Sequence, residues 1–442
     1  MFYAIFRAFL NLCLRIMYRR IEAPGLASLP SGSILLAANH GNALMDPLLL
    51  LVLLPRPITF LAKHTLFRMP LVGFFLKRIG GLPVYRRQDA TGESKKNEET
   101  LDACGRILSS GGVVCLFPEG KSHDEPKLQE LRTGAARIYF RAAQSATENP
   151  TVIPTGINYE AKKAFRSRVL VVFGKPVSVS ELLELERARP EQGVAALTHR
   201  IEEALTELIP GLDSWEELEF LRDIRALFLG RREESLSEEA ASLRRFIRAY
   251  RFYREREPEA VAVIRGHWKA YRRQLGRFSL KEEEVDLAEA PVRAARFALL
   301  SAAVILGVLP LALVGLLTHY PAYRICGEVE RRANRFPDQT ATFKLIGGVL
   351  LFPLSYAVTV ALLAWWGGWK AVALGTVLLP LSGWAALRVA EERQRLLEGV
   401  QALSLAFASG KALRQIRRQR RQILESVSAL IREHPPEAAA LR

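Results

Sequence analysis

A histidine and an aspartate lie six positions apart in the stretch AANHGNALMDP, which begins at the end of the apolar run SGSILLAA. A neutral imidazole accepts a proton from a hydroxyl near pH 7, and a neighbouring carboxylate orients the ring and stabilises the imidazolium. His40 and Asp46 therefore suit general-base chemistry. No GxSxG turn surrounds them, so the hydroxyl would belong to a substrate. The structural alternative is a histidine that caps a helix and an aspartate that closes a turn.

Charged residues follow a second apolar run, in the stretch CLFPEGKSHDEPKL. A carboxylate and an ammonium at a strand end, here Glu119 and Lys121, suit an anionic, hydroxylated ligand. A nucleotide-binding P-loop would need a glycine five residues before Gly120, and that position holds a cysteine. His123 and Asp124 form another polar pair, for which an ordinary polar turn is the alternative to a catalytic role.

Two further stretches add a phosphate-binding group and an unusual strand. GGLPVYRR ends in Arg86 and Arg87, and a guanidinium holds phosphate bidentately. VIPTGINY carries a proline inside an apolar strand.

In their order and spacing along the chain, the four stretches resemble the four sequence blocks of the glycerolipid acyltransferase superfamily, which includes the 1-acylglycerol-3-phosphate acyltransferases. The resemblance covers roughly residues 20–180. The blocks correspond, in order, to Asn39, His40 and Asp46; to Gly81, Val84 and Arg86; to Phe117, Pro118, Glu119 and Gly120; and to the strand around Pro154.

Two departures from the common family pattern narrow the resemblance. Five residues separate His40 from Asp46 where the family usually has four, and KSHD follows the third block where a TRS run is common. Both details resemble the subgroup that acylates glycerol-3-phosphate or dihydroxyacetone phosphate. The extra residue requires a local bulge or turn to keep Asp46 near His40.

The resemblance implies that His40 deprotonates the acceptor hydroxyl, that Asp46 orients His40, and that the oxygen attacks a thioester without an acyl-enzyme. It assigns the acceptor phosphate to Arg86, helped by Lys121, and an acceptor hydroxyl or a basic residue to Glu119. The substrate-binding blocks also contain Gly81, Gly120 and Pro154. No metal or bound cofactor is implied, since acyl-CoA or acyl-carrier protein is the donor substrate.

Three other functions compete with acylation of glycerol-3-phosphate. A lysophosphatidate or other lysophospholipid acyltransferase would use the same histidine and aspartate. A non-catalytic membrane scaffold would not need them intact. The net charge of +16 requires an acidic partner, but no nucleic-acid-binding motif is present, so lipid is the simpler partner.

Short apolar runs alternate with helical patterns over residues 23–180, which predicts an α/β acyltransferase domain with a mixed sheet flanked by helices. We expect strands in SILLAA, PITFLA, LPVY, GVVCLFP, TVIPTGINY and RVLVVFG, and helices in NEETLDACGRILSS and LQELRTGAARIYFRAAQSA. The polar stretch RRQDATGESKKNEET is expected to be a loop. Residues 181–290 form a charged helical region.

The composition changes after residue 290. Residues 291–390 are expected to form a membrane region with two or three apolar helices, since 297–317, 345–366 and 371–387 lack charge and approach the length of about 20 residues needed to cross a bilayer. Whether the first run crosses or re-enters is left open, and a buried soluble hairpin is the alternative. No catalytic residue is expected in these runs, whose role would be anchoring.

The two ends of the chain carry further membrane signals. Residues 1–22 predict an amphipathic interfacial helix whose arginines face lipid phosphates, with a packed surface helix as the alternative. Residues 391–442 predict a basic helical tail, either on anionic lipid or solvated. The scattered cysteines exclude a CxxC site and favour a reducing compartment. We therefore expect an integral membrane protein whose catalytic domain faces the cytoplasm.

Overall fold

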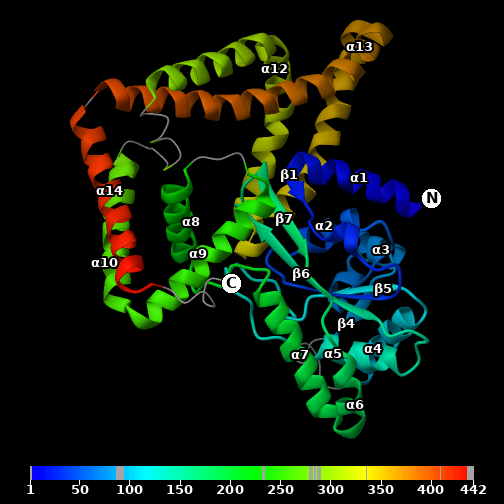
Figure 1. Cartoon of the computed structure of the whole chain (residues 1–442). Coiled ribbons are helices and arrows are strands. Elements are labelled where there is room, and N and C mark those ends of the chain that lie inside the picture. Colours follow the sequence, from blue (N-terminus) through cyan, green and yellow to red (C-terminus); the bar gives the residue numbers. More distant parts are fainter. Residues whose placement is uncertain are drawn as a thin grey trace. The chain divides into compact units, whose positions relative to one another are not determined.

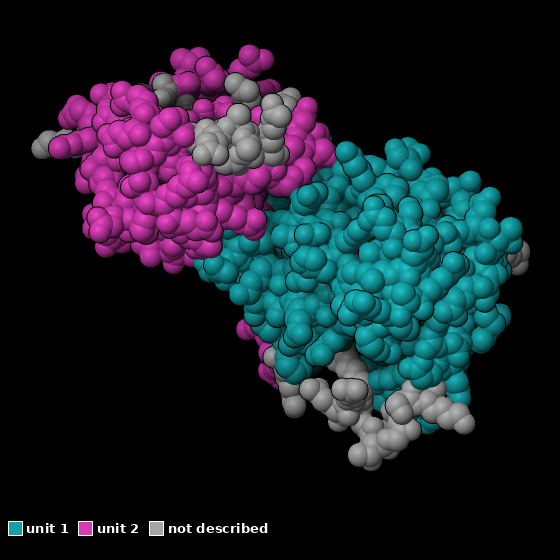
Figure 2. Space-filling model, turned by 60° about the horizontal axis from the view of Figure 1, so that its bottom comes forward, with its two compact units in different colours: residues 1–215, 333–345 teal, residues 216–332, 346–442 magenta. Residues whose placement is uncertain are grey.

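The computed structural model describes residues 2–85, 94–230, 234–277, 282, 285, 290–334, 336–408 and 410–435. The chain divides into two compact units, coloured separately in Figure 2. The first contains residues 1–215 and 333–345, and the second contains residues 216–332 and 346–442.

A seven-stranded mixed sheet forms the centre of the first unit (Figure 1), as the sequence predicts. Its strand order is β1-β7-β6-β2-β5-β3-β4, and only β6 and β7 pair antiparallel. The strands are β1 (Tyr18–Glu22), β2 (Ile34–Ala38), β3 (Thr59–Lys63), β4 (Leu82–Val84), β5 (Val113–Leu116), β6 (Thr151–Tyr159) and β7 (Ser167–Phe173).

Helices cover both faces of this sheet, which explains why β2 is buried at every position. On one face, Leu35 of β2 and Val114 of β5 belong to an apolar cluster that includes residues of α4, α5 and α7. The helices of this unit are α1 (Phe2–Met17), α2 (Met45–Leu53), α3 (Pro70–Arg78), α4 (Ser94–Ser109), α5 (Gly134–Ala143), α6 (Ser180–Ala188) and α7 (Pro190–Thr206), with 3₁₀ turns η1 (Leu26–Ser28), η2 (His64–Arg68) and η3 (Pro337–Gln339).

The sheet unit extends beyond the expected boundary at residue 180. Leu197, Ile201 and Leu205 of α7 are fully buried in the cluster that covers the sheet. Apolar burial therefore joins α6 and α7 to the sheet, although their sequence is as charged as the region that follows. In the expected loop of residues 86–100, residues 94–100 begin α4, and the remainder lies outside the described residues.

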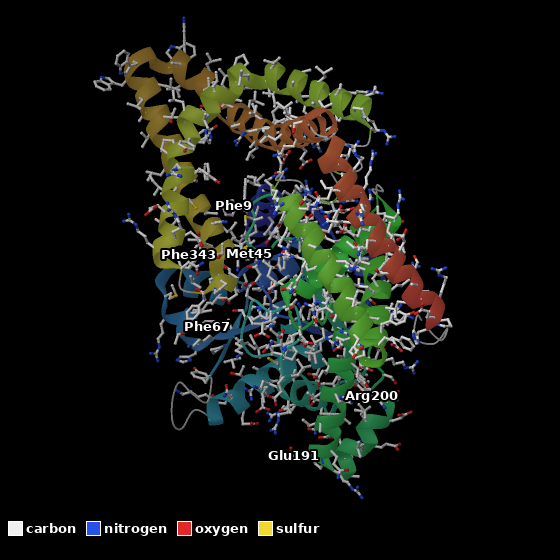
Figure 3. The ribbon with its side chains drawn as sticks, turned by 90° about the vertical axis from the view of Figure 1, so that its left-hand side faces the viewer. Phe9, Met45, Phe67, Glu191, Arg200 and Phe343 are labelled. Carbon is white, nitrogen blue, oxygen red and sulfur yellow. The ribbon has the colours of Figure 1, made fainter. Side chains whose placement is uncertain are left out.

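The N-terminal segment forms a helix followed by a strand rather than one helix. Arg7 lies on the inner side of α1, where its guanidinium donates two hydrogen bonds, of 2.9 and 3.0 Å, to the Val52 carbonyl at the end of α2. The expectation that this arginine faces lipid is therefore wrong. Instead, α1 exposes an apolar face formed by Ile5, Phe9, Leu12 and Ile16, and Figure 3 labels Phe9.

Among the described residues of the second unit, the polar part consists of four charged helices. They are α8 (Trp215–Leu229), whose first residue belongs to the first unit, α9 (Leu236–Arg256), α10 (Pro258–Arg277) and α14 (Gly410–Glu433). Their buried faces are apolar and aromatic, as at Phe220, Tyr250 and Trp268. Their charged faces form ion pairs between helices, such as Arg265 with Glu216 at 2.8 Å.

Two long helices carry the apolar runs. α12 (Pro291–Ala333) and α13 (Thr340–Ala408) each have a window long and apolar enough to cross a membrane, and those windows are only 17% and 6% buried. Such exposure argues against the buried soluble hairpin. Gly368, at φ 63°, kinks α13 within the WWGGW stretch, and Trp365 and Trp366 beside it are more than 80% exposed.

Small residues bring the two apolar helices together. A Cβ added to Gly315 of α12 would lie 2.0 Å from the Ser382 carbonyl oxygen of α13, and one added to Gly347 would lie 2.7 Å from Cys326 Sγ. Close backbone approach at glycine is typical of helices packed in membranes.

We predict that Gly156→Ala destabilises the sheet unit. The added Cβ would lie 2.6 Å from Leu208 Cβ and 2.9 Å from the Leu208 carbonyl oxygen. Overpacking of this kind costs about 1–3 kcal/mol, so thermal unfolding should show a lower melting temperature. Gly32→Ala is the control, since no heavy atom lies within 4 Å of its added Cβ. Equal melting temperatures for the two variants would contradict the prediction.

Candidate active site

The candidate active site lies at the carboxyl edge of the parallel strands. β2 pairs in parallel with both β5 and β6. His40 follows β2 and Glu119 follows β5, so adjacent parallel strands deliver both residues to the same edge of the sheet.

Asn39 fixes the backbone immediately before His40. Its side chain makes two hydrogen bonds with the Ile157 backbone, where Nδ2 donates to the carbonyl at 3.1 Å and Oδ1 accepts from the amide at 2.6 Å. Its own amide donates to the Thr155 carbonyl at 3.4 Å. Asn39 thereby prolongs the pairing of β2 with β6 by one residue and sets the position from which the histidine projects.

Asp46 is fully buried in the first turn of α2, and three donors satisfy its carboxylate. Oδ2 lies 2.9 Å from His40 Nδ1 and accepts from the Asn42 amide at 2.7 Å. Oδ1 accepts from the Tyr159 hydroxyl at 2.6 Å. The carboxylate holds a proton on Nδ1 and leaves Nε2 of His40 as the acceptor. The imidazole also stacks on Phe117, with ring centroids 4.1 Å apart.

Tyr159 remains a hydrogen-bond donor over the physiological pH range. Burial raises the pKa of its phenol well above the ordinary value, and the negative charge of Asp46 raises it further. A protonated phenol at this position donates to Asp46 Oδ1 and fixes the plane of the carboxylate.

A turn accommodates the extra residue between His40 and Asp46. Ala43 adopts φ 30°, a conformation that non-glycine residues rarely adopt and that costs about 1–3 kcal/mol. The Met45 amide closes this turn by donating to the Asn42 carbonyl at 2.8 Å. The turn brings Asp46 back to His40, as the five-residue spacing requires.

Glu119 joins the loop after β5 to the loop after β2. It is 3% exposed, and its Oε1 accepts from the His40 amide at 2.6 Å. Its Oε2 accepts from the Gln129 amide at 2.8 Å and lies 2.5 Å from His123 Nε2. The His123 amide donates to the His40 carbonyl at 3.1 Å. Of the two roles expected for Glu119, these contacts favour holding a basic residue, and they give His123 a structural partner.

The two residues after Glu119 lie at the surface. Gly120 adopts φ 72°, and its amide donates to the Phe117 carbonyl at 2.9 Å, so the chain turns sharply here. Lys121 is exposed and makes no hydrogen bond or ion pair with the residues that the structure describes.

Gly81 and Pro154 contribute backbone geometry to the sheet. Gly81 ends the turn after α3, where its amide donates to the Leu76 carbonyl at 2.8 Å, and precedes the edge strand β4. Pro154 is buried in β6 opposite Ala37 of β2. Arg86 and Arg87 lie outside the described residues, so a phosphate-binding role for Arg86 stays a prediction.

Residues 333–345, which contain the connection between α12 and α13 and the first residues of α13, belong to the same compact unit as the candidate active site. The Ser122 hydroxyl hydrogen-bonds with the Asp338 carboxylate, and the Leu44 amide donates to Thr342 Oγ1 at 3.3 Å. Figure 3 labels Met45 and Phe343, the residues that follow this second contact. The segment between the apolar runs thus contacts both loops that carry the site, which sequence reasoning did not anticipate.

Sequence reasoning also missed Tyr159 and Lys162. Tyr159 is the last residue of β6 and reaches Asp46 because β6 lies beside β2. Its signal was weak, since a tyrosine at the end of an apolar strand is common. Lys162 lies within the polar stretch that follows β6, and nothing in its spacing distinguishes it from other surface lysines.

Two family profiles match the chain. One is described as Acyltransferase and matches residues 20–158, and the other as the glycerol-3-phosphate acyltransferase 2 C-terminal domain and matches residues 221–439. Together they account for most of the sequence, and each falls largely within one of the two units.

The chain is also similar to named acyltransferases. The chain is 24% identical to an uncharacterized acyltransferase of Schizosaccharomyces pombe, over 97% of this chain and 80% of that protein. It is 24% identical to glycerol-3-phosphate O-acyltransferase 1 of Saccharomyces cerevisiae, over 76% of this chain and 48% of that protein, so it spans about half the length of this relative. A solved structure, the 1-acyl-sn-glycerophosphate acyltransferase of Thermotoga maritima, is similar over 44% of this chain and 79% of that one, with 18% identity and a TM-score of 0.32.

The order of the four sequence blocks, the two profiles and the named relatives agree with one another. The chain resembles the glycerolipid acyltransferase superfamily over most of its length and is an O-acyltransferase.

Proposed function

We propose that this protein transfers a fatty acyl group from an acyl thioester to a hydroxyl of glycerol-3-phosphate, with His40 as the general base. The observation that carries the proposal is the hydrogen bond of 2.9 Å between His40 Nδ1 and the buried Asp46 carboxylate. It leaves Nε2 as the ring nitrogen able to accept a proton.

The reaction proceeds by direct attack. Nε2 of His40 takes the proton of the acceptor hydroxyl as the hydroxyl oxygen attacks the thioester carbon. The tetrahedral intermediate collapses when the carbon–sulfur bond breaks, and the imidazolium returns its proton to the departing thiolate. The products are an ester and a free thiol, and no acyl-enzyme forms. Asp46 stays hydrogen-bonded to Nδ1 throughout and stabilises the transient imidazolium.

The acceptor assignment rests on the sequence details and the relatives. The five-residue spacing and the KSHD run resemble the subgroup that acylates glycerol-3-phosphate, and two of the named relatives are glycerol-3-phosphate O-acyltransferases. Other relatives are named 1-acyl-sn-glycerol-3-phosphate acyltransferases, so lysophosphatidate is the second candidate acceptor. Incubating the purified protein with labelled acyl-CoA and each acceptor separates the two. Acyl-CoA or acyl-carrier protein serves as the donor, and no resident cofactor or metal takes part.

The membrane is the proposed site of this reaction. α12 and α13 anchor the chain, and the exposed apolar face of α1 lies against the lipid surface that supplies the acyl chains. We place the catalytic unit on the cytoplasmic side, where acyl thioesters and glycerol-3-phosphate are made.

We predict that His40→Ala lowers the acyl-transfer rate about 10²–10⁴-fold while the protein stays folded, because a positioned general base contributes about that much. The measurement is kcat with labelled acyl-CoA, together with a thermal melt. His199→Ala is the control, since this histidine is exposed on α7 and pairs with Glu203 at 3.4 Å. Turnover of His40→Ala near that of the control would refute the mechanism.

We predict that Tyr159→Phe lowers kcat about tenfold or more and leaves the KM of the acceptor little changed. The substitution removes one of three donors to Asp46, and a hydrogen bond to a charged group contributes about 1.5–3 kcal/mol. Tyr139→Phe is the matched control, because this buried hydroxyl has no hydrogen-bond partner among the described residues. A larger effect in the control, or a change confined to KM, would count against the role of Tyr159.

We predict that Ser122→Ala and Asp338→Ala affect catalysis through one shared interaction. Each substitution should lower kcat/KM, and the double variant should be little worse than either single one. A double-mutant cycle should give a coupling of about 0.5–3 kcal/mol, the usual range for residues in contact. Fully additive effects would show that the segment between the apolar helices does not support the loop that contains Glu119.

A further inference from the structure

Lys162 places a largely buried ammonium group beside the loop that contains His40. It lies three residues beyond β6, and its side chain is 11% exposed. A Cβ added to Gly41, the residue after His40, would lie 3.0 Å from Lys162 Nζ. The backbone is tied to the same loop, because Asn42 Nδ2 donates to the Lys162 carbonyl at 3.4 Å.

The ammonium of Lys162 has no hydrogen-bond acceptor within 3.5 Å among the described residues. Its nearest carboxylate oxygen, Oδ1 of Asp124, lies 3.9 Å away, and the Trp215 ring lies 5.0 Å from Nζ. The other oxygen of Asp124 pairs with Lys163 at 2.7 Å. An ammonium carries three hydrogen-bond donors, so it can donate to the oxygens of a bound anion.

The neighbouring carboxylates do not fully compensate the positive charge of Lys162. Burial lowers the pKa of Lys162, and the nearby carboxylates of Asp124, Asp46 and Glu119 oppose that effect without cancelling it. The positive charge of Lys163 also lowers the pKa of Lys162. A charged group buried without close partners is costly, and a bound anion would relieve that cost.

The position of Lys162 matches the geometry of the acceptor. The attacked hydroxyl must lie at Nε2 of His40, and only a short carbon chain separates this hydroxyl from the phosphate of a glycerol phosphate. The absence of a side chain at Gly41 leaves room for Nζ next to the histidine. Lys121, the lysine that the resemblance assigns to phosphate binding, is exposed at the surface.

We propose that Lys162 binds the phosphate group of the acceptor through its ammonium and so contributes to the choice of a phosphorylated alcohol. This inference rests on the proposed function. On phosphate binding, Nζ exchanges its long contact with Asp124 for direct hydrogen bonds to phosphate oxygens, and Asp124 remains paired with Lys163.

The test compares the full-length wild-type protein with Lys162→Met and Lys162→Arg in detergent. Steady-state kinetics give kcat and the KM of glycerol-3-phosphate and of acyl-CoA, and calorimetric titration gives the affinity for glycerol-3-phosphate without turnover. Lys127→Met is the matched control, since Lys127 also lies 3.9 Å from a carboxylate, that of Asp213, but is 43% exposed. Thermal melts report whether each variant folds.

For Lys162→Met we expect the KM and the Kd of glycerol-3-phosphate to rise about 10- to 100-fold, the usual effect of losing a charged hydrogen bond. We expect kcat, the KM of acyl-CoA and the melting temperature to stay near those of Lys127→Met. Lys162→Arg should recover part of the affinity. A fall in kcat at constant KM would assign the lysine to the thioester carbonyl and overturn the proposal. An unchanged Kd for glycerol-3-phosphate, or a loss of folding in both Lys162 variants, would overturn it as well.

A wrong choice of acceptor can be told apart from a wrong role for Lys162. If the wild-type protein acylates lysophosphatidate and not glycerol-3-phosphate, the glycerol-3-phosphate assignment fails, and the same comparison is made with lysophosphatidate and with inorganic phosphate in the titration. Weaker binding of these phosphates to Lys162→Met would still support the role of Lys162. Equal binding by the wild-type protein and Lys162→Met, or no binding by either, would overturn it.

Discussion

Asp46 is fully buried, and its carboxylate has three hydrogen-bond partners from two separate segments of the chain. Because a buried carboxylate without donors is very costly, this one group requires His40, the Asn42 amide and the Tyr159 hydroxyl to meet at fixed positions. Ala43 adopts its uncommon backbone conformation within the turn that brings them together. The reactive face of the imidazole is therefore set by the packing of β2, α2 and β6.

Glu119 extends the same arrangement to the next strand. It bonds the His40 amide on one side and His123 and the Gln129 amide on the other, so the two catalytic loops cannot separate without exposing a buried carboxylate. The contact of Ser122 with Asp338 adds a third segment, from more than two hundred residues away in the chain. The residues that join the apolar helices therefore have a structural role of their own, in addition to the anchoring role that we propose for the helices.

In the first unit, the basic residues at the surface differ from the basic residue at the candidate site. Most basic residues of this unit lie at the surface and suit an acidic partner such as a membrane. The side chain of Lys162 is only 11% exposed, and it lies beside the loop of His40 and near three carboxylates. Helix α1 has a polar residue inside and apolar residues outside. Arg7 donates a hydrogen bond to the carbonyl of Val52 at the end of α2, and Phe9 is exposed on the opposite, apolar face. In both cases burial, and not the residue type, decides which group is available to a ligand.

The sequence alone determined the α/β class, the order along the chain of six of the seven strands, the apolar helices and the candidate site residues His40, Asp46 and Glu119. It did so because these features are local: a strand or a spanning helix is specified by its own residues, and a base with its carboxylate stands within seven positions. Tertiary structure alone decided that the Tyr159 hydroxyl donates to Asp46 and that residues 333–345 contact the loops of the candidate site. It also decided that Lys162 is largely shielded from solvent while Lys121 is exposed. These contacts depend on the pairing of β2 with β6 and on a segment returning from far along the chain, and no spacing within a sequence specifies which distant residues share a pocket.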